Sequence, residues 1–322
     1  RKVGEVLAQL YDGRVSATYP AYPEGPLART HYIVGRYDGV TPALDQATLE
    51  EAVADVARTW SDGLTERLRQ SEEPARARQL VGRYGEAFSA AYREAFSPGE
   101  ALDDIAILER LDAARPHAVD IGRRPGDPDT RASLMLFSWG RSLPLSERVP
   151  LLEHLGFRAV SERTYSVTPP DSDGASFAIH DMTLERAMGG PIDVERLEIL
   201  LESALMALLA GEAESDGYNA LVLEAGIGWR DVAALRTLSR FLQQARVPFS
   251  QDYMAATLVK HAEAARLLVE LLHARFDPSD AAGVDRESRQ AEVRGRIEAA
   301  LSAVTSLDED RILRRFVNLI EA

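Results

Sequence analysis

The chain has 322 residues, 45% of them hydrophobic, and a formal net charge of −14 with a pI near 5.0. The length allows two or three domains, and the negative field argues against nucleic acid or an anionic membrane as a partner. Cysteine is absent, which excludes disulfides and thiolate chemistry and fits a cytoplasmic protein, and no apolar run reaches the roughly 18 residues that cross a bilayer.

Residues 1–40 predict a helix followed by two strands. The helix is expected over Val3–Tyr11 with Gly13 behind its end, and the β-prone runs Arg14–Tyr19 and Leu27–Arg36 flank a turn rich in proline. A leading strand would lie before residue 1. Because the chain starts without methionine and ends without a stop signal, we expect a piece of a longer protein whose first 40 residues end a truncated α/β unit.

Residues 41–115 predict a helical region. A capping box at Thr48–Glu51 is expected to start one helix that continues to Leu68. Behind Pro74, a second helix is predicted to carry a ridge that we interpret as buried packing rather than a ligand platform. The ridge consists of Leu80, Tyr84, Phe88, Tyr92 and Phe96. Another capping box at Ser97–Glu100 predicts a short helix through Leu111.

Residues 130–212 predict a mixed α/β domain that follows a polar linker at Pro116–Asp129. The expected order is β-α-β-β-α, which is most of a ferredoxin-like unit. Its elements are strand Ala132–Phe137, helix Leu145–Leu155 capped by Gly156, strands Phe157–Val167 and Ser176–Met182, and helix Asp193–Ala210.

Residues 213–322 predict a second helical region, with three amphipathic helices between Tyr218 and Pro278. The first carries apolar residues from Val232 to Leu242, Phe241 included, and turns Arg236 and Arg240 away from the core. A charged helix over Arg286–Val304 and a capping box at Ser306–Glu309 follow, with a loop at 280–285. The predicted fold class is therefore α+β, with ferredoxin-like units combined with helical bundles.

The run from Ala225 to Pro278 resembles the segment just ahead of the catalytic domain in the very large bacterial NAD-specific glutamate dehydrogenases. The Trp229-Arg230 pair, Pro248–Gln251 and Ala274–Pro278 carry the resemblance, which extends to the tail at 307–322. It implies ACT-like modules at 1–40 and 130–212 and a parent that interconverts L-glutamate with 2-oxoglutarate and ammonia using NAD. It also implies a downstream catalytic domain and the other subunits of a homo-oligomer as partners.

The catalytic motifs of such an enzyme are not expected in this chain. Gly226-Ile-Gly228 lacks the third glycine of a dinucleotide-binding turn. The two lysines, Lys2 and Lys260, do not match a catalytic motif of the family, and the six histidines lack the spacing of a metal site. We therefore predict no catalytic, cofactor or metal residue here.

Two sets of candidate residues remain. In ACT-like modules the loop from the first strand into the first helix often holds an amino-acid effector, which points to Gly140, Arg141 and Ser142. Packing or docking roles are expected for Trp229, Arg230, Phe249 and Phe276. The leading hypothesis is a regulatory and assembly region. The alternatives are a stand-alone amino-acid-sensing module and a purely structural helical scaffold.

Overall fold

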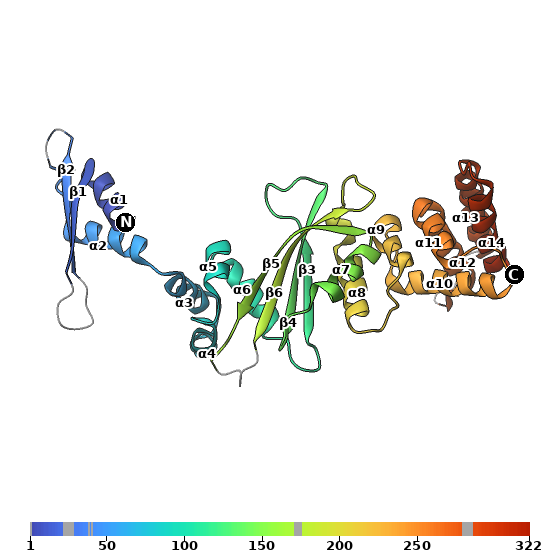
Figure 1. Ribbon diagram of the computed structural model, residues 1–322, viewed down its shortest axis with the longest axis horizontal. Helices are drawn as coiled ribbons and strands as arrows, with labels where there is room; N and C mark the ends of the chain where they lie inside the picture. Colours follow the sequence, from blue (N-terminus) through green and yellow to red (C-terminus); the bar gives the residue numbers. More distant parts are fainter. Residues whose placement is uncertain (1, 22–28, 38, 40, 171–175, 279–285) are drawn as a thin grey trace. The chain divides into compact units, whose positions relative to one another are not determined.

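The computed structural model describes residues 2–21, 29–37, 39, 41–170, 176–278 and 286–322. They form two compact units, one of residues 1–86 and 93–103 and the other of residues 87–92 and 104–322. Small antiparallel sheets alternate with helices along the chain, which confirms the predicted α+β class (Figure 1). Within the described ranges, no helix has the length and apolar character required to cross a membrane.

The first unit begins with the predicted helix and hairpin. Helix α1 (Lys2–Leu10) precedes β1 (Gly13–Ala21) and β2 (Arg29–Arg36), which pair antiparallel with Gly13 opposite Arg36. Strand β1 extends through Pro20, which the sequence placed in the turn. Most of the predicted turn, at 22–26, and the first two residues of the predicted strand Leu27–Arg36 lie outside the described residues.

The predicted single helix at 48–68 is wrong, because the chain contains two helices there, α2 (Gln46–Ala57) and α3 (Trp60–Ser71). Asp45, rather than Thr48, caps α2 and accepts from the Thr48 N–H at 2.7 Å. Thr59 and Asp62 form the capping box of α3, through reciprocal bonds of 3.1 and 3.0 Å. A side chain that satisfies orphan helix donors starts a new helix even where the apolar stripe continues.

The aromatic ridge is also divided among elements. Leu80 and Tyr84 lie in helix α4 (Pro74–Tyr84). Phe88 lies outside any helix and forms an isolated bridge with Val167, and Tyr92 lies in helix α5 (Ala90–Ala95). The Phe88 and Tyr92 rings stack with centroids 4.5 Å apart, and Tyr92 meets Tyr165 edge-on at 5.7 Å. The packing role is confirmed for these two rings, which are buried.

Helix α6 (Glu100–Leu108) follows the predicted capping box. The Ser97 N–H donates to the Glu100 carboxylate at 2.8 Å, and the Glu100 N–H donates to the Ser97 hydroxyl at 3.3 Å. The predicted helix through Leu111 is therefore three residues too long at its C-terminal end.

The predicted linker at Pro116–Asp129 contains a strand, β3 (His117–Gly122), which corrects that prediction. It pairs antiparallel with β4 (Arg131–Trp139). The four strands of the sheet lie in the order β3-β4-β6-β5. Pro, Gly and Arg around β3 hide an alternation of His117, Val119 and Ile121 on one face. Strand β3 takes the edge that the last strand occupies in a β-α-β-β-α-β unit, which makes this sheet a circular permutation of the ferredoxin-like arrangement.

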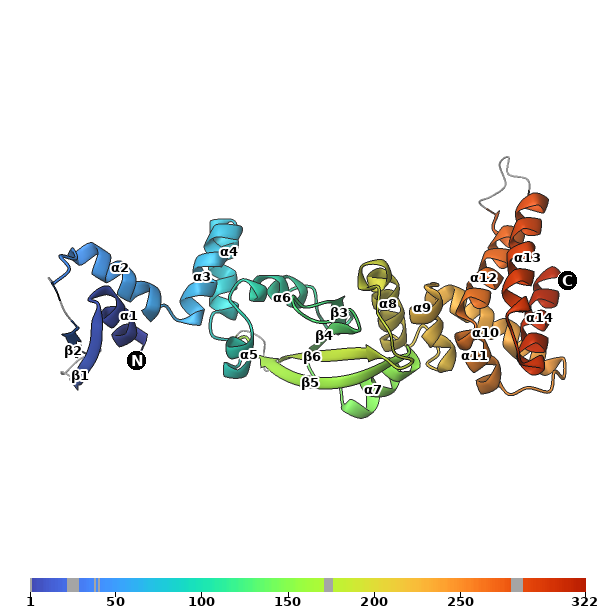
Figure 2. The same cartoon turned by 90° about the horizontal axis from the view of Figure 1, so that it is seen from above.

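The remaining elements of the sheet unit follow the prediction closely. They are α7 (Leu145–His154), β5 (Phe157–Val167), β6 (Phe177–Arg186) and α8 (Val194–Leu209). One apolar core joins the inner faces of these strands to α7 and α8 and continues into the helices that follow. Figures 1 and 2 show the ribbon of this sheet and of the helices that follow it. The sheet and the C-terminal helices therefore share a single hydrophobic core.

The C-terminal helices close around this core. They are the 3₁₀ helix η1 (Gly217–Ala220), α9 (Leu221–Ala225), α10 (Trp229–Gln244), α11 (Gln251–Lys260), α12 (Ala262–Phe276), α13 (Arg286–Ser302) and α14 (Leu307–Glu321). Val293, Ile297 and Leu301 of α13 are buried within the chain. The predicted loop at 280–285 lies outside the described residues.

Two predicted orientations on α10 are wrong. Phe241 is 53% exposed, whereas Arg236 is only 4% exposed. The Arg236 guanidinium binds both carboxylate oxygens of Asp216, at 2.7 and 2.8 Å, and also donates to the Glu214 carbonyl at 3.2 Å. Arg236 turns inward because the loop before η1 supplies a carboxylate and a carbonyl that satisfy its donors.

The same polar cluster extends to Tyr218, whose hydroxyl contacts Ser239 and the Gln251 side chain. Burial raises the pKa of the Tyr218 hydroxyl to about 12, so this group remains a neutral hydrogen-bonding partner at physiological pH. The cluster joins η1, α10 and α11 and fixes how these helices pack.

Candidate functional site

The loop that carries the predicted effector residues leads from β4 into α7. Gly140 has a φ of +80°, and no atom lies within 4 Å of the position of an added Cβ. Its N–H donates to the Ser176 carbonyl at 2.8 Å, and the Arg141 N–H donates to the Trp139 carbonyl at 3.0 Å. Glycine is therefore required here by the backbone, and these two amides hold the loop rather than point at a ligand.

Arg141 lies beside the first turn of α7. Its guanidinium forms a two-point ion pair with Glu147, at 3.1 and 3.3 Å, and the Glu147 hydrogen bond raises the pKa of Arg141. Both side chains are exposed, so water and salt weaken the pair. A ligand carboxylate could compete with Glu147 for this guanidinium.

Ser142 connects the loop to a buried histidine. Its hydroxyl lies 3.3 Å from Nε2 of His180, which is fully buried on β6. The other ring nitrogen, Nδ1, lies 3.0 Å from the Thr164 hydroxyl and 3.3 Å from the Glu162 carboxylate. Because a carboxylate only accepts, we assign the proton to Nδ1, and Nε2 then accepts from Ser142.

Glu162 also binds Arg148 of α7, whose side chain is 7% exposed. Burial, followed by the positive charge of Arg148, lowers the pKa of His180, so its neutral form is favoured. The sequence pattern singled out none of His180, Glu162, Thr164 and Arg148. Simple alternation starting from the buried Phe157 would place Glu162 and Thr164 on the opposite face of the strand. The β-bulge between Ala159 and Ser161 shifts the register and brings both side chains to the face of His180.

Several buried polar atoms around this cluster have no hydrogen-bond partner among the described residues. They include the Ser138 hydroxyl, Nε of Arg148 and Nδ1 of His117. Buried polar atoms normally make hydrogen bonds, and a buried atom without one points to a bound water, ion or other polar group. The loop thus presents a charged surface group, Arg141, and the cluster contains buried polar atoms that make no hydrogen bond within the described residues.

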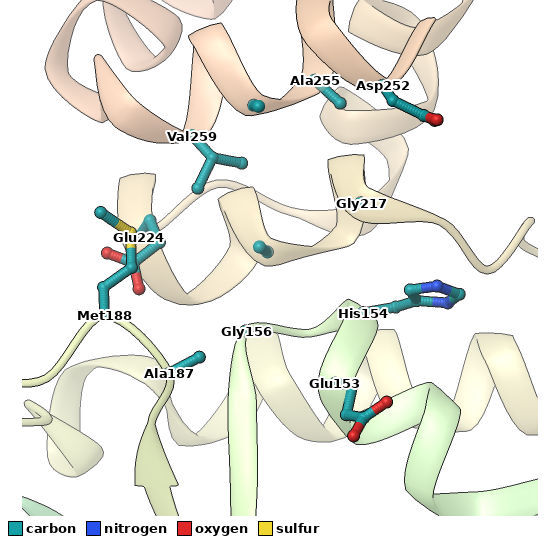
Figure 3. A pocket seen from close by; sticks show the side chains of 12 residues that line it. Glu153, His154, Gly156, Ala187, Met188, Gly217, Glu224, Asp252, Ala255 and Val259 are labelled. Atoms are coloured by element: carbon teal, nitrogen blue, oxygen red, sulfur yellow. The ribbon is translucent and has the colours of Figure 1, made fainter.

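A separate pocket of about 390 Å³ lies where α7 and the end of β6 meet η1, α9 and α11 (Figure 3). Gly156, Ala220 and Ala255 are among its small lining residues, and Glu153 and Asp252 supply carboxylates. Gly156 has a φ of +89°, and an added Cβ would lie 3.3 Å from Cβ of Ala220. The pocket marks the junction between the sheet unit and the C-terminal helices.

The four predicted docking residues do not form one surface. Trp229, at the start of α10, is half-buried against the core, with the Arg230 guanidinium 4.2 Å from its ring centre. Phe249 packs on the core near Tyr253, beyond the other end of α10. Phe276 is 58% exposed at the end of α12, beside a small pocket that Asp231 of α10 also lines. Trp229 and Phe249 are thus partly buried against the core, whereas Phe276 is the most exposed of the three aromatic residues.

Lys260 forms an ion pair with Glu309 of α14, with distances of 2.7 and 3.0 Å to the two carboxylate oxygens. His261 contacts the same carboxylate at 2.8 Å. Ser306 caps α14 as predicted, but the Glu309 side chain serves this cluster. Lys260 thus joins α11 to α14. In the part of the chain that the structure describes, no group of three His, Asp or Glu residues could hold a metal ion.

Four family models match successive stretches of the chain. All four describe parts of glutamate dehydrogenase: the ACT2 domain at residues 1–61, helical motif 2 at 67–111, the ACT3 domain at 116–197 and helical motif 3 at 213–278. The ACT3 match includes β3, in agreement with the strand that the sequence reading had missed.

Similar curated proteins carry the name NAD-specific glutamate dehydrogenase. Those from Halomonas elongata and Pseudomonas aeruginosa are 35% and 32% identical over all 322 residues, which make up 20% of each relative. The Mycobacterium tuberculosis protein is 32% identical over 279 residues, or 85% of this chain and 17% of that protein. The chain spans about a fifth of the length of these relatives. It therefore belongs to the glutamate dehydrogenase family, as a stretch of ACT domains and helical motifs.

Proposed function

We propose that this chain is a regulatory and assembly region of a cytoplasmic NAD-specific glutamate dehydrogenase. The parent would oxidatively deaminate L-glutamate to 2-oxoglutarate and ammonia with NAD, in a catalytic domain downstream of this chain. The chain itself would carry neither the reaction site nor the NAD site. Its partners would be that catalytic domain and the other subunits of a homo-oligomer.

The observation that carries the proposal is the continuous core. The inner faces of the sheet strands, α7, α8 and the helices through α14 belong to one hydrophobic cluster. Packed interiors are stiff and transmit displacement rather than absorb it. A change that moves α7 can therefore reach α14, which supports a connecting role for residues 213–322 between the ACT-like unit and the catalytic domain.

The chemistry of the lysines and glycines also supports this division of labour. Lys260 is held by Glu309, and Gly226 caps α9 with a φ of +64°. Gly228 directly precedes α10 as its N-cap and does not end a strand. A dinucleotide turn needs glycines between a strand and a helix.

We further propose that Gly140, Arg141 and Ser142 form an effector site for an amino acid. Arg141 would bind the ligand carboxylate in place of Glu147, and Ser142 would report occupancy to His180. The proposed domain boundaries are 1–40, 41–115, 130–212 and 213–322, with β3 added to the third. Trp229, Arg230, Phe249 and Phe276 remain proposed as packing and docking residues.

A thermal-shift series tests the effector site. A panel of amino acids at millimolar concentration is expected to raise the melting temperature of the chain through the Gly140 loop, and Gly140→Ala should abolish that rise. Gly126→Ala is the matched control, because Gly126 has a φ of +90° and equally open surroundings in another loop. If no amino acid shifts the chain, or if both variants respond alike, the effector proposal fails.

The two alternatives differ in measurable ways. A structural scaffold would self-associate firmly in sedimentation experiments and show no ligand response. A stand-alone amino-acid sensor would respond to the ligand, yet the Gly140→Ala change would leave the activity of the parent enzyme unchanged with and without that ligand.

A further inference from the structure

A second pocket, of about 560 Å³, lies between the segment that enters β3 and the C-terminal end of α8. Its volume falls in the range of about 300–1,000 Å³ that small-molecule sites occupy. Gly140, Arg141 and Ser142 do not line it, although burial and then the positive charge of Arg141 lower the pKa of His117, which does. Its lining comes from Ala113, Ala114, Arg115, Pro116, His117, Met206, Leu209, Ala210 and Glu212.

One wall of the pocket carries a positive charge on a fixed turn. Asp112 accepts from the N–H groups of Ala114 and Arg115, at 2.9 and 2.8 Å, and its own N–H donates to the Arg115 carbonyl at 3.2 Å. The Arg115 side chain is 73% exposed, and its shortest contact with the Asp112 carboxylate is long, at 3.4 Å. Such an exposed and long ion pair is weak, so most donors of this guanidinium remain available.

The segment that follows α8 supplies negative charge to the pocket lining. Helix α8 ends at Leu209, and Gly211, with a φ of +71°, reverses the chain so that the Glu212 N–H donates back to the Ala207 carbonyl at 2.9 Å. This closure places Glu212 at the C-terminal end of a 16-residue helix. The last carbonyls of a helix carry a partial negative charge that adds to the carboxylate and favours a cation.

The space between the two walls is apolar. Met206, Leu209 and Pro116 line it, and His117 contributes a ring whose buried Nδ1 has no partner among the described residues. Burial lowers the pKa of His117, so the ring is neutral at physiological pH and Nδ1 can accept a hydrogen bond.

We propose that this pocket binds a small zwitterion with an apolar side chain, of the α-amino acid class. The ligand carboxylate pairs with Arg115, the ammonium group with Glu212 and the C-terminal end of α8, and the side chain packs on Met206 and Leu209. Opposite charges from two segments that line one pocket, together with apolar lining residues, match this chemistry and disfavour ligands that carry only one of the two charges.

Calorimetric titration of the 322-residue chain with L-leucine tests the site. Each charge-assisted contact contributes roughly 1.5–3 kcal/mol, so its loss is expected to weaken binding by about tenfold or more. Isoamylamine, which lacks the carboxylate, and 4-methylpentanoate, which lacks the ammonium group, should therefore bind at least about tenfold more weakly than leucine.

Variants identify the two walls. Arg115→Gln should weaken leucine and 4-methylpentanoate but not isoamylamine, and Glu212→Gln should weaken leucine and isoamylamine but not the acid. Both residues are exposed, so the fold is expected to tolerate these changes. Glu195→Gln, the same change at the other end of α8, is the matched control and should leave binding unchanged.

Two results would overturn the site. The first is no saturable binding of leucine, methionine or phenylalanine at millimolar concentration. The second is binding that Arg115→Gln and Glu212→Gln leave intact. If Gly140→Ala abolishes binding while these two variants do not, the ligand belongs to the β4–α7 loop instead, and the effector proposal survives without this pocket.

Discussion

Replacing Arg236 by methionine should loosen the junction between η1 and α10. The guanidinium is 4% exposed and makes bonds of 2.7 and 2.8 Å to Asp216 and one of 3.2 Å to the Glu214 carbonyl. Removing one partner of a buried ion pair costs about 3–5 kcal/mol. The Asp216 side chain is 35% exposed, so water recovers part of this loss, and we expect a cost of about 2–4 kcal/mol.

Hydrogen exchange measures this cost locally, which avoids treating a chain of several units as two-state. The opening free energy of amides in η1 and the first half of α10 should fall by the stated amount. Arg240→Met is the matched control, because Arg240 lies one turn further along and binds Glu214 in an exposed pair. Little change is expected there. If Arg236→Met costs no more than Arg240→Met, the buried network does not hold η1 to α10.

Three further predictions concern the sheet unit and its junction. Gly156→Ala should lower the local opening free energy measured by hydrogen exchange by about 1–3 kcal/mol, because it combines left-handed strain with a 3.3 Å contact to Ala220. An equal local cost for Gly126→Ala would refute the packing part. Acidification from pH 7 to 5 should destabilise the chain, because burial lowers the pKa of His180 in the folded state and the unfolded state therefore binds the proton at a higher pH. His180→Gln should make the free energy of unfolding less dependent on pH in this range. If the pH dependence of the variant equals that of the original chain, His180 is not its source. Trp229→Ala should lower stability by about 1–3 kcal/mol and weaken self-association, since the ring is half-buried; if sedimentation and unfolding are both unchanged, Trp229 is no packing or docking residue.

The sequence was sufficient for elements whose signals are local. The ends of α7 and α8 follow from Gly156 and Asp193, which act within one turn of the helix they terminate or start. It was insufficient where a stronger local signal competed with the apolar stripe. Thr59 and Asp62 break a helix that periodicity alone would continue, and the prolines and glycines around β3 resemble a linker although a neighbouring strand pairs with it.

The candidate site was predictable only in part for the same reason. Gly140 could be found from its place between a strand and a helix, which is a matter of chain order. Glu162 and His180 reach Ser142 only through sheet pairing, because 20 and 38 residues separate them from it in the sequence. Arg236 was assigned to solvent because periodicity carries no information about Asp216, which lies 20 residues upstream. Partners across elements decide whether a charged side chain turns inward.

The central claim is that this chain regulates and assembles an enzyme whose reaction takes place elsewhere. The most direct test is the rate of NADH oxidation by the purified 322-residue chain in the presence of 2-oxoglutarate and ammonium. We expect a rate equal to that of the buffer control at every substrate concentration. A saturable rate that depends on both substrates would contradict this expectation and place a reaction site within these residues.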